Sequence, residues 1–94
     1  MAKKLNFLIS AGPTREWIDP VRFISKPSSG KMGYALSTEA QNRNFLVTLI
    51  SGPVCLEEPH GVCVKKVETA EQMRKAMLEN FEMADVIIMC AAVC

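Results

Sequence analysis

The chain has 94 residues, a formal net charge of +1 and a hydrophobic content of 49%, which describes one compact domain or part of one. The near-neutral charge argues against nucleic-acid or membrane-surface binding, because both would show a basic excess. We therefore treat residues 1–94 as a single domain.

The N-terminal residues and the cysteines favour a cytoplasmic protein. The apolar run at residues 5–9 is too short for a secretory signal or a membrane span. The cysteines lack the density of a secreted scaffold, so we expect reduced thiols at Cys55, Cys63, Cys90 and Cys94. Because no C-x-x-C pair or recognised zinc spacing occurs, we expect no metal site.

The first predicted element is a buried strand over residues 5–10, ended by a turn at residues 11–13. Prolines at positions 13, 20 and 27 prevent the following segment from being one helix. We interpret residues 14–27 as a long, partly ordered loop. Loops of this length in compact domains are usually functional.

The charged residues of this loop allow two interpretations. Arg15 or Arg22, held near a phosphate, would make a bidentate clamp. Alternatively, Glu16 and Asp19 neutralise these arginines and fix the loop. Trp17 is expected to anchor the loop to the core.

A helix is predicted over residues 30–43, where apolar residues fall at helical spacing. Ser29 is the expected N-cap, and Asn44 is expected to take the left-handed conformation that ends the helix. Strands are predicted over residues 45–50 and 62–67.

The last two elements have clear signals. Thr69 and Gln72 have capping-box spacing and begin an amphipathic helix that runs to about residue 82. Residues 86–93 are apolar at every position, which is typical of a strand buried on both faces of a parallel sheet.

This order of elements predicts an α/β fold, a Rossmann-like three-layer sandwich with an open, mostly parallel sheet. In the common doubly wound order, strands three, two, one and four lie side by side, and ligands bind where the order reverses. The loops at residues 10–13 and 91–94 would then converge over the N-terminus of the first helix.

Hydroxyls and glycines directly precede that helix, where backbone N–H groups and the helix dipole favour an anion. The candidate phosphate ligands are Ser28, Ser29, Gly30, Lys31 and the amide of Met32. Gly33 would allow close approach of the helix to the sheet. The structural alternative is a capped helix with a small residue for packing.

Six segments together resemble the phosphopantothenate-cysteine ligase family, also called phosphopantothenoylcysteine synthetase. They are residues 11–16 (AGPTRE), 18–25 (IDPVRFIS), 28–33 (SSGKMG), 48–54 (TLISGPV), 67–70 (VETA) and 91–93 (AAV). The match spans nearly the whole chain and identifies it with the N-terminal part of the family's nucleotide-binding ligase domain.

The resemblance implies a ligase of coenzyme A biosynthesis. In bacterial members CTP activates 4′-phosphopantothenate as an acyl-cytidylate, which the cysteine amine attacks, and magnesium offsets the phosphate charge. By position, Gly12 and residues 28–33 would lie at the phosphates, and Arg22 would face the acyl substrate. Backbone groups of Ala91, Ala92 and Val93 would hold the nucleotide. A flavin domain precedes the ligase in many members; because this chain begins just before the first strand, we expect no flavin.

Two features depart from the family pattern. Lys26 stands where the family has an asparagine associated with the cysteine step, and an ammonium cannot accept a hydrogen bond. We expect Lys26 to impair that step and to leave activation possible. The family also continues beyond position 94 through an aspartate and a lysine-bearing lid, so we expect the 94 residues alone to be inactive.

Two other functions remain open. The first is a non-catalytic nucleotide-binding remnant or interaction module. The second is an NAD(P)-dependent oxidoreductase, although Gly12 and Gly30 are too far apart for a compact dinucleotide fingerprint. Family members are commonly dimers, so a homodimer is a further expectation.

Overall fold

The computed structural model describes residues 4–26 and 28–92. The elements in chain order are β1 (Asn6–Ala11), β2 (Arg15–Trp17), β3 (Phe23–Ser25), α1 (Lys31–Asn42), β4 (Leu46–Ser51), β5 (Cys63–Lys66), α2 (Ala70–Phe81) and β6 (Val86–Met89). Neither described helix is long and apolar enough to cross a membrane.

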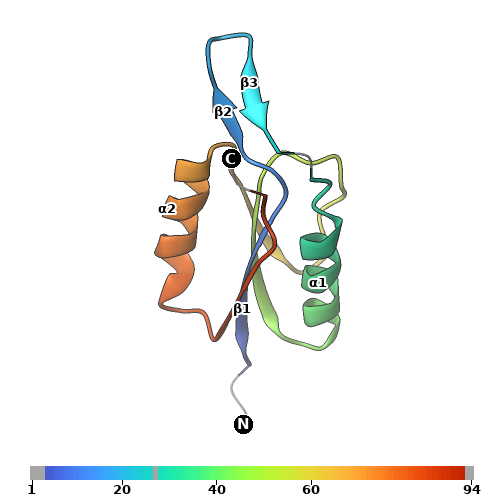
Figure 1. Ribbon diagram of the computed structural model, residues 1–94. Coiled ribbons are helices and arrows are strands. Elements are labelled where there is room, and N and C mark those ends of the chain that lie inside the picture. Colours follow the sequence, from blue (N-terminus) through green and yellow to red (C-terminus); the bar gives the residue numbers. More distant parts are fainter. Residues whose placement is uncertain (1–3, 27, 93–94) are drawn as a thin grey trace.

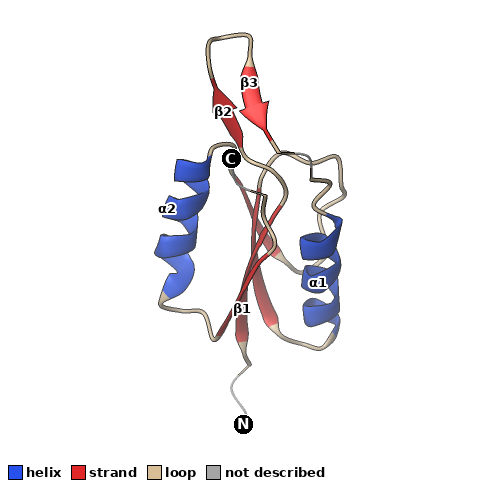
Figure 2. Ribbon diagram, in the orientation of Figure 1, coloured by secondary structure: helices blue, strands red, loops and turns tan. Residues whose placement is uncertain are grey.

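The main sheet is parallel and has the order β5-β4-β1-β6. Helices α1 and α2 cover opposite faces of this sheet (Figures 1 and 2). The α1 connection moves along the sheet in one direction and the α2 connection moves in the other. Right-handed crossovers therefore place the helices on opposite faces. The predicted three-layer fold and strand order are confirmed.

The core lies on both sides of the central strands β1 and β4. Alternation along β1 sends Ile9 toward α1 and Leu8 toward α2, and both side chains are buried. The α1 side contains Ile9, Ala11, Tyr34, Ala40, Val47 and Leu49. The α2 side contains Leu8, Ile50 and Met73. The site residues at the end of β1 therefore rest on the most rigid part of the fold.

Strand β6 differs from the prediction. It ends at Met89, and its side chains alternate between half-buried and exposed positions, with Met89 76% exposed. The prediction of burial on both faces is wrong for the described residues, because β6 pairs only with β1 and is the outermost strand of the sheet. An apolar run fits a central strand, but it does not say which neighbours are present.

Two of the three predicted helix-end features are present. Asn44 is left-handed at φ 66°, and the N–H groups of Asn44 and Phe45 bond back into the last turn of α1. The capping box of α2 is present between Thr69 and Gln72. The predicted N-cap Ser29 is wrong, since Gly30 occupies that position at φ 78°.

Residues 14–26 form an ordered hairpin in place of the predicted loop. Strands β2 and β3 pair in antiparallel register, with Trp17 opposite Phe23. The hairpin projects beyond the carboxyl ends of the parallel strands (Figure 1). At its tip, the Asp19 carboxylate accepts hydrogen bonds from the N–H groups of Val21 and Arg22. The sequence interpretation gave weight to the prolines and missed this short-range turn chemistry.

Candidate functional site

The carboxyl end of β1 and the start of α1 meet at two glycines. Gly12 and Gly30 both have positive φ angles, 81° and 78°. A Cβ built on Gly30 would lie 3.5 Å from the Gly12 Cα and 2.9 Å from Val54 Cγ1. Side chains at these positions would therefore be both strained and crowded. Glycine lets two backbone segments come together at the point where the strand order reverses.

The N-terminus of α1 has amides without protein acceptors. The first helical bond runs from the Tyr34 N–H to the Gly30 carbonyl at 3.1 Å, and Gly30 provides no capping side chain. The Lys31 N–H donates to Ser29 Oγ at 3.3 Å. Among the described residues, the N–H groups of Met32 and Gly33 have no acceptor. Together with the helix dipole, these amides form a site suited to a phosphate oxygen.

The side chains predicted to help this site lie around it. Ser28 is half-buried, whereas Ser29 and Lys31 are exposed. The Ser29 hydroxyl is already in contact with the first turn, although it is not the N-cap. We call residues 28–33 together with Gly12 the cradle.

Gly33 has a packing role that needs no ligand. A Cβ at this position would lie 2.3 Å from the Ala11 Cβ and 3.3 Å from the Ser10 carbonyl oxygen. The close approach of helix to sheet that we expected at Gly33 is present. Gly33 therefore has the packing role that the sequence offered as the alternative to phosphate binding. Its N–H lies at the end of the cradle, so this packing role does not prevent the N–H from binding a phosphate.

In contrast, the N-terminus of α2 is closed by the protein itself. Thr69 Oγ1 accepts from the Gln72 N–H, and Gln72 Oε1 accepts from the Thr69 N–H. Glu16, from the hairpin, accepts from the Ala70 N–H at 2.8 Å. A carboxylate near a helix N-terminus is stabilised by the dipole. Of the two described helices, only α1 begins without a side-chain cap at its N-cap residue.

The loop after β6 reaches the cradle, as predicted. The Ala92 N–H donates to the Gly12 carbonyl at 3.0 Å, and the Thr14 N–H donates to the Ala92 carbonyl at 3.1 Å. Both backbone groups of Ala92 are therefore occupied in holding the two loops together. Ala92 has little remaining ability to form a backbone hydrogen bond to a nucleotide. The backbone groups of Ala91 have no partner among the described residues. Val93 lies outside the described residues.

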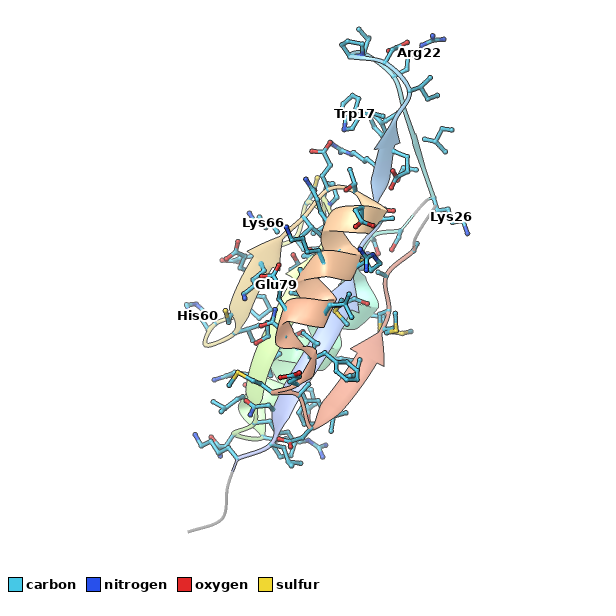
Figure 3. The ribbon with its side chains drawn as sticks, turned by 90° about the vertical axis from the view of Figure 1, so that its left-hand side faces the viewer. Trp17, Arg22, Lys26, His60, Lys66 and Glu79 are labelled. Atoms are coloured by element: carbon cyan, nitrogen blue, oxygen red, sulfur yellow. The ribbon has the colours of Figure 1, made fainter. Side chains whose placement is uncertain are left out.

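Arg22 is not brought to the cradle. It lies at the tip of the hairpin, where its side chain is 74% exposed and pairs with Asp19 at 2.7 Å (Figure 3). Hydrogen bonds from the Val21 N–H, and then from the Arg22 side chain and N–H, lower the pKa of Asp19. Lys26 is exposed and directly follows β3, at the base of the hairpin and well away from the tip (Figure 3).

The hairpin is attached to α2. The Arg15 N–H donates to the Glu68 carbonyl at 2.7 Å, and Trp17 Nε1 donates to Glu68 Oε1. Trp17 therefore attaches the hairpin to the segment before α2, but its side chain is 47% exposed and is not part of either core cluster, so the predicted anchoring to the core is not seen. The sequence interpretation missed Glu68, although its place directly before a capping box was a usable signal. Asp19 neutralises Arg22 as one alternative predicted, but Glu16 bonds α2 and forms no ion pair with an arginine in the part of the chain that the structure describes.

A buried hydrogen bond connects α1 to the end of β4, and the sequence interpretation missed it. The Tyr34 hydroxyl and Ser51 Oγ lie 2.8 Å apart, and Ser51 Oγ donates to the Gly52 carbonyl. Both side chains are buried. This bond fixes the first turn of α1 relative to the sheet and so supports the cradle.

The described residues contain no group of three histidine, cysteine or acidic side chains that could hold a metal ion. Cys55, Cys63 and Cys90 are free thiols, and His60 is exposed. No protein ligand set for a cation is therefore apparent in these parts of the chain.

Comparison with known proteins gives consistent matches. The profile of the family "DNA/pantothenate metabolism flavoprotein C-terminal domain" matches residues 2–94. The chain is 52% identical over 88 residues to the coenzyme A biosynthesis bifunctional protein CoaBC of Vibrio parahaemolyticus, and the match covers 94% of this chain and 22% of that protein. It is 50% identical over 91 residues to CoaBC of Escherichia coli K12, with 97% and 22% coverage.

The solved structures agree with the sequence matches. The crystal structure of the C-terminal domain of CoaBC superposes with a TM-score of 0.91 at 48% identity, covering 95% of this chain and 45% of that one. A complex of a Cab2 mutant with phosphopantothenate-cysteine has a TM-score of 0.53 at 15% identity, which supports the fold alone. The chain spans 22% of the length of these curated relatives.

Proposed function

The chain belongs to the family of the DNA/pantothenate metabolism flavoprotein C-terminal domain, and on this basis we propose that it is part of a CTP-dependent phosphopantothenate-cysteine ligase. Its relatives are coenzyme A biosynthesis enzymes. In the proposed reaction a carboxylate oxygen of 4′-phosphopantothenate attacks the α-phosphorus of CTP and pyrophosphate leaves. The cysteine amine then attacks the acyl carbon of the acyl-cytidylate, and CMP leaves.

The observation that carries this proposal is the open N-terminus of α1 beside Gly12. The N–H groups of Met32 and Gly33 have no acceptor among the described residues, and Gly30 adds no side chain at the start of the helix. Phosphoryl and nucleotidyl transfer depend mainly on positioning and on electrostatic stabilisation of the phosphate oxygens. The cradle supplies both without needing a strong base.

The remaining residues have narrower roles in the proposal. Ser28 and Ser29 add hydroxyl donors, and Lys31 adds a point charge at the rim of the cradle. Ala91 and Val93 are the proposed backbone contacts to the nucleotide, whereas Ala92 holds the loop against Gly12. Arg22 and Lys26 lie on the hairpin. They can contact the acyl substrate, as proposed, only if the substrate extends from the cradle toward β3.

In the proposal magnesium belongs with the triphosphate, but the described residues bring together no cluster of ligands for it, so we assign it no step. The family name includes a flavoprotein, and we assign no flavin chemistry to residues 1–94. Both expectations stay predictions, as do a cytoplasmic location and a homodimer.

Calorimetric titration of the chain with CTP, ATP, NAD and NADP tests the proposal. We expect CTP to bind and the dinucleotides not to bind. Ser29→Ala should weaken CTP binding, and Thr38→Ala, a matched loss of a hydroxyl on the exposed side of α1, should leave it unchanged. Binding of NAD or NADP without binding of CTP would favour the hypothesis of an NAD(P)-dependent oxidoreductase.

A second function is favoured by Lys26. If this side chain prevents the cysteine step, the chain serves as a non-catalytic nucleotide-binding remnant or an interaction module. The exposed apolar side chains of β6 are consistent with an interaction surface. In that case CTP would bind in the titration, but residues 1–94 joined to the remainder of a ligase domain would form no ligated product from 4′-phosphopantothenate and cysteine.

A further inference from the structure

A cavity of about 430 Å³ lies on the α2 face of the sheet, between α2 and the outermost strand β6. Most of the side chains that line it are apolar, and three of them are methionines: Met73 and Met77 of α2 and Met89 of β6. The cavity has the size of a small-molecule site. Its lining shares no residue with the cradle, although Ala91, at one end, also has a place in the proposed ligase function.

Ser10 brings a hydroxyl to the floor of this cavity. Strand alternation puts Ser10 on the α2 face of β1, because Leu8, two residues earlier, packs with Met73 on that face. The register partner of Ser10 on β6 is Met89, which lines the same cavity. Ser10 is only 1% exposed, and its Oγ has no hydrogen-bond partner among the described residues.

The other buried serines of the described chain do have partners. Ser37 Oγ donates to the Gly33 carbonyl at 2.8 Å, and Ser51 Oγ lies 2.8 Å from the Tyr34 hydroxyl. A buried hydroxyl without a partner is destabilising, so a ligand that supplies a donor or an acceptor recovers free energy. The unpaired hydroxyl of Ser10 therefore marks a place for the polar group of a ligand.

The charged residues of the cavity neutralise each other. Glu71 and Arg74, one turn apart on α2, form a double hydrogen bond in which Arg74 Nε donates to Glu71 Oε2 at 3.0 Å. Both side chains are more than half exposed, so this pair lies at the rim of the cavity. An ionised ligand would lose hydration against the apolar wall without gaining a counter-ion. The cavity therefore favours a neutral molecule.

The methionines allow the cavity to adjust to an occupant. Met73 is 4% exposed, whereas Met89 is 76% exposed, so the cavity is closed toward the core and open beside β6. Methionine side chains are unbranched and polarizable, and they pack against groups of different shape. Because Ser10 Oγ is buried, a ligand reaches it when these side chains turn, which their flexibility permits.

We propose that the cavity between α2 and β6 binds a small neutral molecule that has an apolar body and one hydroxyl or carbonyl group, and that this group forms a hydrogen bond with Ser10 Oγ. Met73, Met77 and Met89 receive the apolar body. The proposal does not depend on the ligase function, because these four residues belong neither to the cradle nor to the hairpin.

Titration of the 94-residue chain with cyclohexanol, followed by nuclear magnetic resonance of the methionine methyl groups, tests the site. We expect saturable shifts of the Met73, Met77 and Met89 methyls. The exposed Met32 and Met83 do not line the cavity, so their methyls should show no saturable shift. Cyclohexanecarboxylate, which has the same ring and a negative charge, should bind more weakly. Unchanged affinity for cyclohexanol in the presence of CTP would support a separate site, and displacement by CTP would overturn it.

A variant assigns the hydrogen bond to Ser10. Ser10→Ala should weaken cyclohexanol binding about two- to tenfold, the usual size for the loss of one neutral hydrogen bond. Because the hydroxyl is unpaired in the fold, its removal should not destabilise the chain, which circular dichroism checks. Ser37→Ala removes a buried hydroxyl on the α1 side of the sheet and should leave cyclohexanol binding unchanged.

Three results would overturn the proposal in addition to displacement by CTP. The first is the failure of cyclohexanol to cause saturable shifts of the cavity methyls. The second is equal affinity of the parent and Ser10→Ala for cyclohexanol. The third is a dependence of the same methyl shifts on protein concentration without the alcohol, which would show that a second copy of the chain covers the cavity.

Discussion

Glu16 Oε1 accepts a hydrogen bond from the backbone N–H of Ala70 at 2.8 Å, across 54 positions of the sequence. This bond joins the hairpin to the first residue of α2 and completes the capping of that helix. The Arg15 N–H and the Trp17 indole also bond Glu68, just before α2, and so hold the hairpin against the same end of that helix. The hairpin that carries Arg22 and Lys26 is therefore positioned by α2, and of the two described helices only α1 keeps an open N-terminus.

Replacing Glu16 by alanine should loosen the hairpin. The loss of a capping acceptor should lower the free energy of unfolding by about 0.5–2 kcal/mol. Because Trp17 is the only tryptophan, its emission should shift toward longer wavelength as the indole becomes more exposed. Glu16→Gln keeps an acceptor oxygen and should restore most of both properties. Glu79→Ala, an exposed loss of a carboxylate on α2, is the control (Figure 3). Parent-like emission of Glu16→Ala would show that this bond does not hold the hairpin.

Gly33→Ala should change the free energy of unfolding, and the sign of the change separates helix propensity from overpacking. Helix propensity alone predicts a gain of about 1 kcal/mol for alanine in a helix. The new Cβ would lie 2.3 Å from the Ala11 Cβ, so we expect a net loss of about 1–3 kcal/mol from overpacking. Urea unfolding measures the change. Ala35→Gly, on the exposed side of the same helix, should cost about 1 kcal/mol from propensity alone. A more stable Gly33→Ala variant would contradict the close contact.

Much of the fold could be predicted because it depends on local pattern and chain topology. Alternating and continuous apolar runs marked β1, β4 and β6, and the capping box marked the start of α2. The common doubly wound order then gave the strand order, and right-handed connections gave the faces that the helices cover. Exposure of Met89 could not be predicted, because it depends on what pairs with the outer edge of β6. Local sequence does not contain that information.

The site was predictable where backbone chemistry decides it and not where side chains reach across the fold. Glycines before an apolar-periodic segment pointed to the cradle, and the convergence of the loops that carry Gly12 and Ala92 followed from topology, although the bond between these two residues was not predicted. The bond between Glu16 and Ala70 joins residues far apart in sequence, and no local pattern announces it. The same is true of Tyr34 and Ser51, whose contact depends on how α1 lies on β4.

The tip of the hairpin should respond to acid. Bonds from the Val21 N–H, the Arg22 side chain and the Arg22 N–H hold the pKa of Asp19 below its ordinary value of 3.8. A lowered folded pKa means that the charged form is favoured in the hairpin. Its contribution is complete above pH 3.8 and is lost as the pH falls through the lowered value.

Nuclear magnetic resonance of the Val21 and Arg22 amides against pH measures this titration. We expect both shifts to change together below pH 3.8, with the amides of β4 unaffected in that step. Asp19→Asn keeps an acceptor oxygen and should remove the pH dependence. A midpoint at or above 3.8 in the parent would contradict the lowered pKa.

Lys26 provides the test of the second chemical step. An ammonium has three donors and no acceptor, so it cannot make the acceptor bond of the asparagine that the resemblance to the ligase family implies for this position. We expect residues 1–94 to be inactive in ligation by themselves, and the comparison therefore uses them joined to the remainder of a ligase domain. There, the parent should form acyl-cytidylate from CTP and 4′-phosphopantothenate and convert it slowly with cysteine.

Lys26→Asn should increase cysteine turnover and reduce the accumulated acyl-cytidylate, while the rate of activation stays the same. Lys26→Met, which removes the charge without adding an acceptor, separates the loss of the ammonium from the gain of the amide. Because Lys26 is exposed and has no hydrogen-bonded side-chain partner among the described residues, neither change should alter stability by more than about 0.5 kcal/mol. Equal cysteine turnover by the parent and Lys26→Asn would show that position 26 does not limit this step.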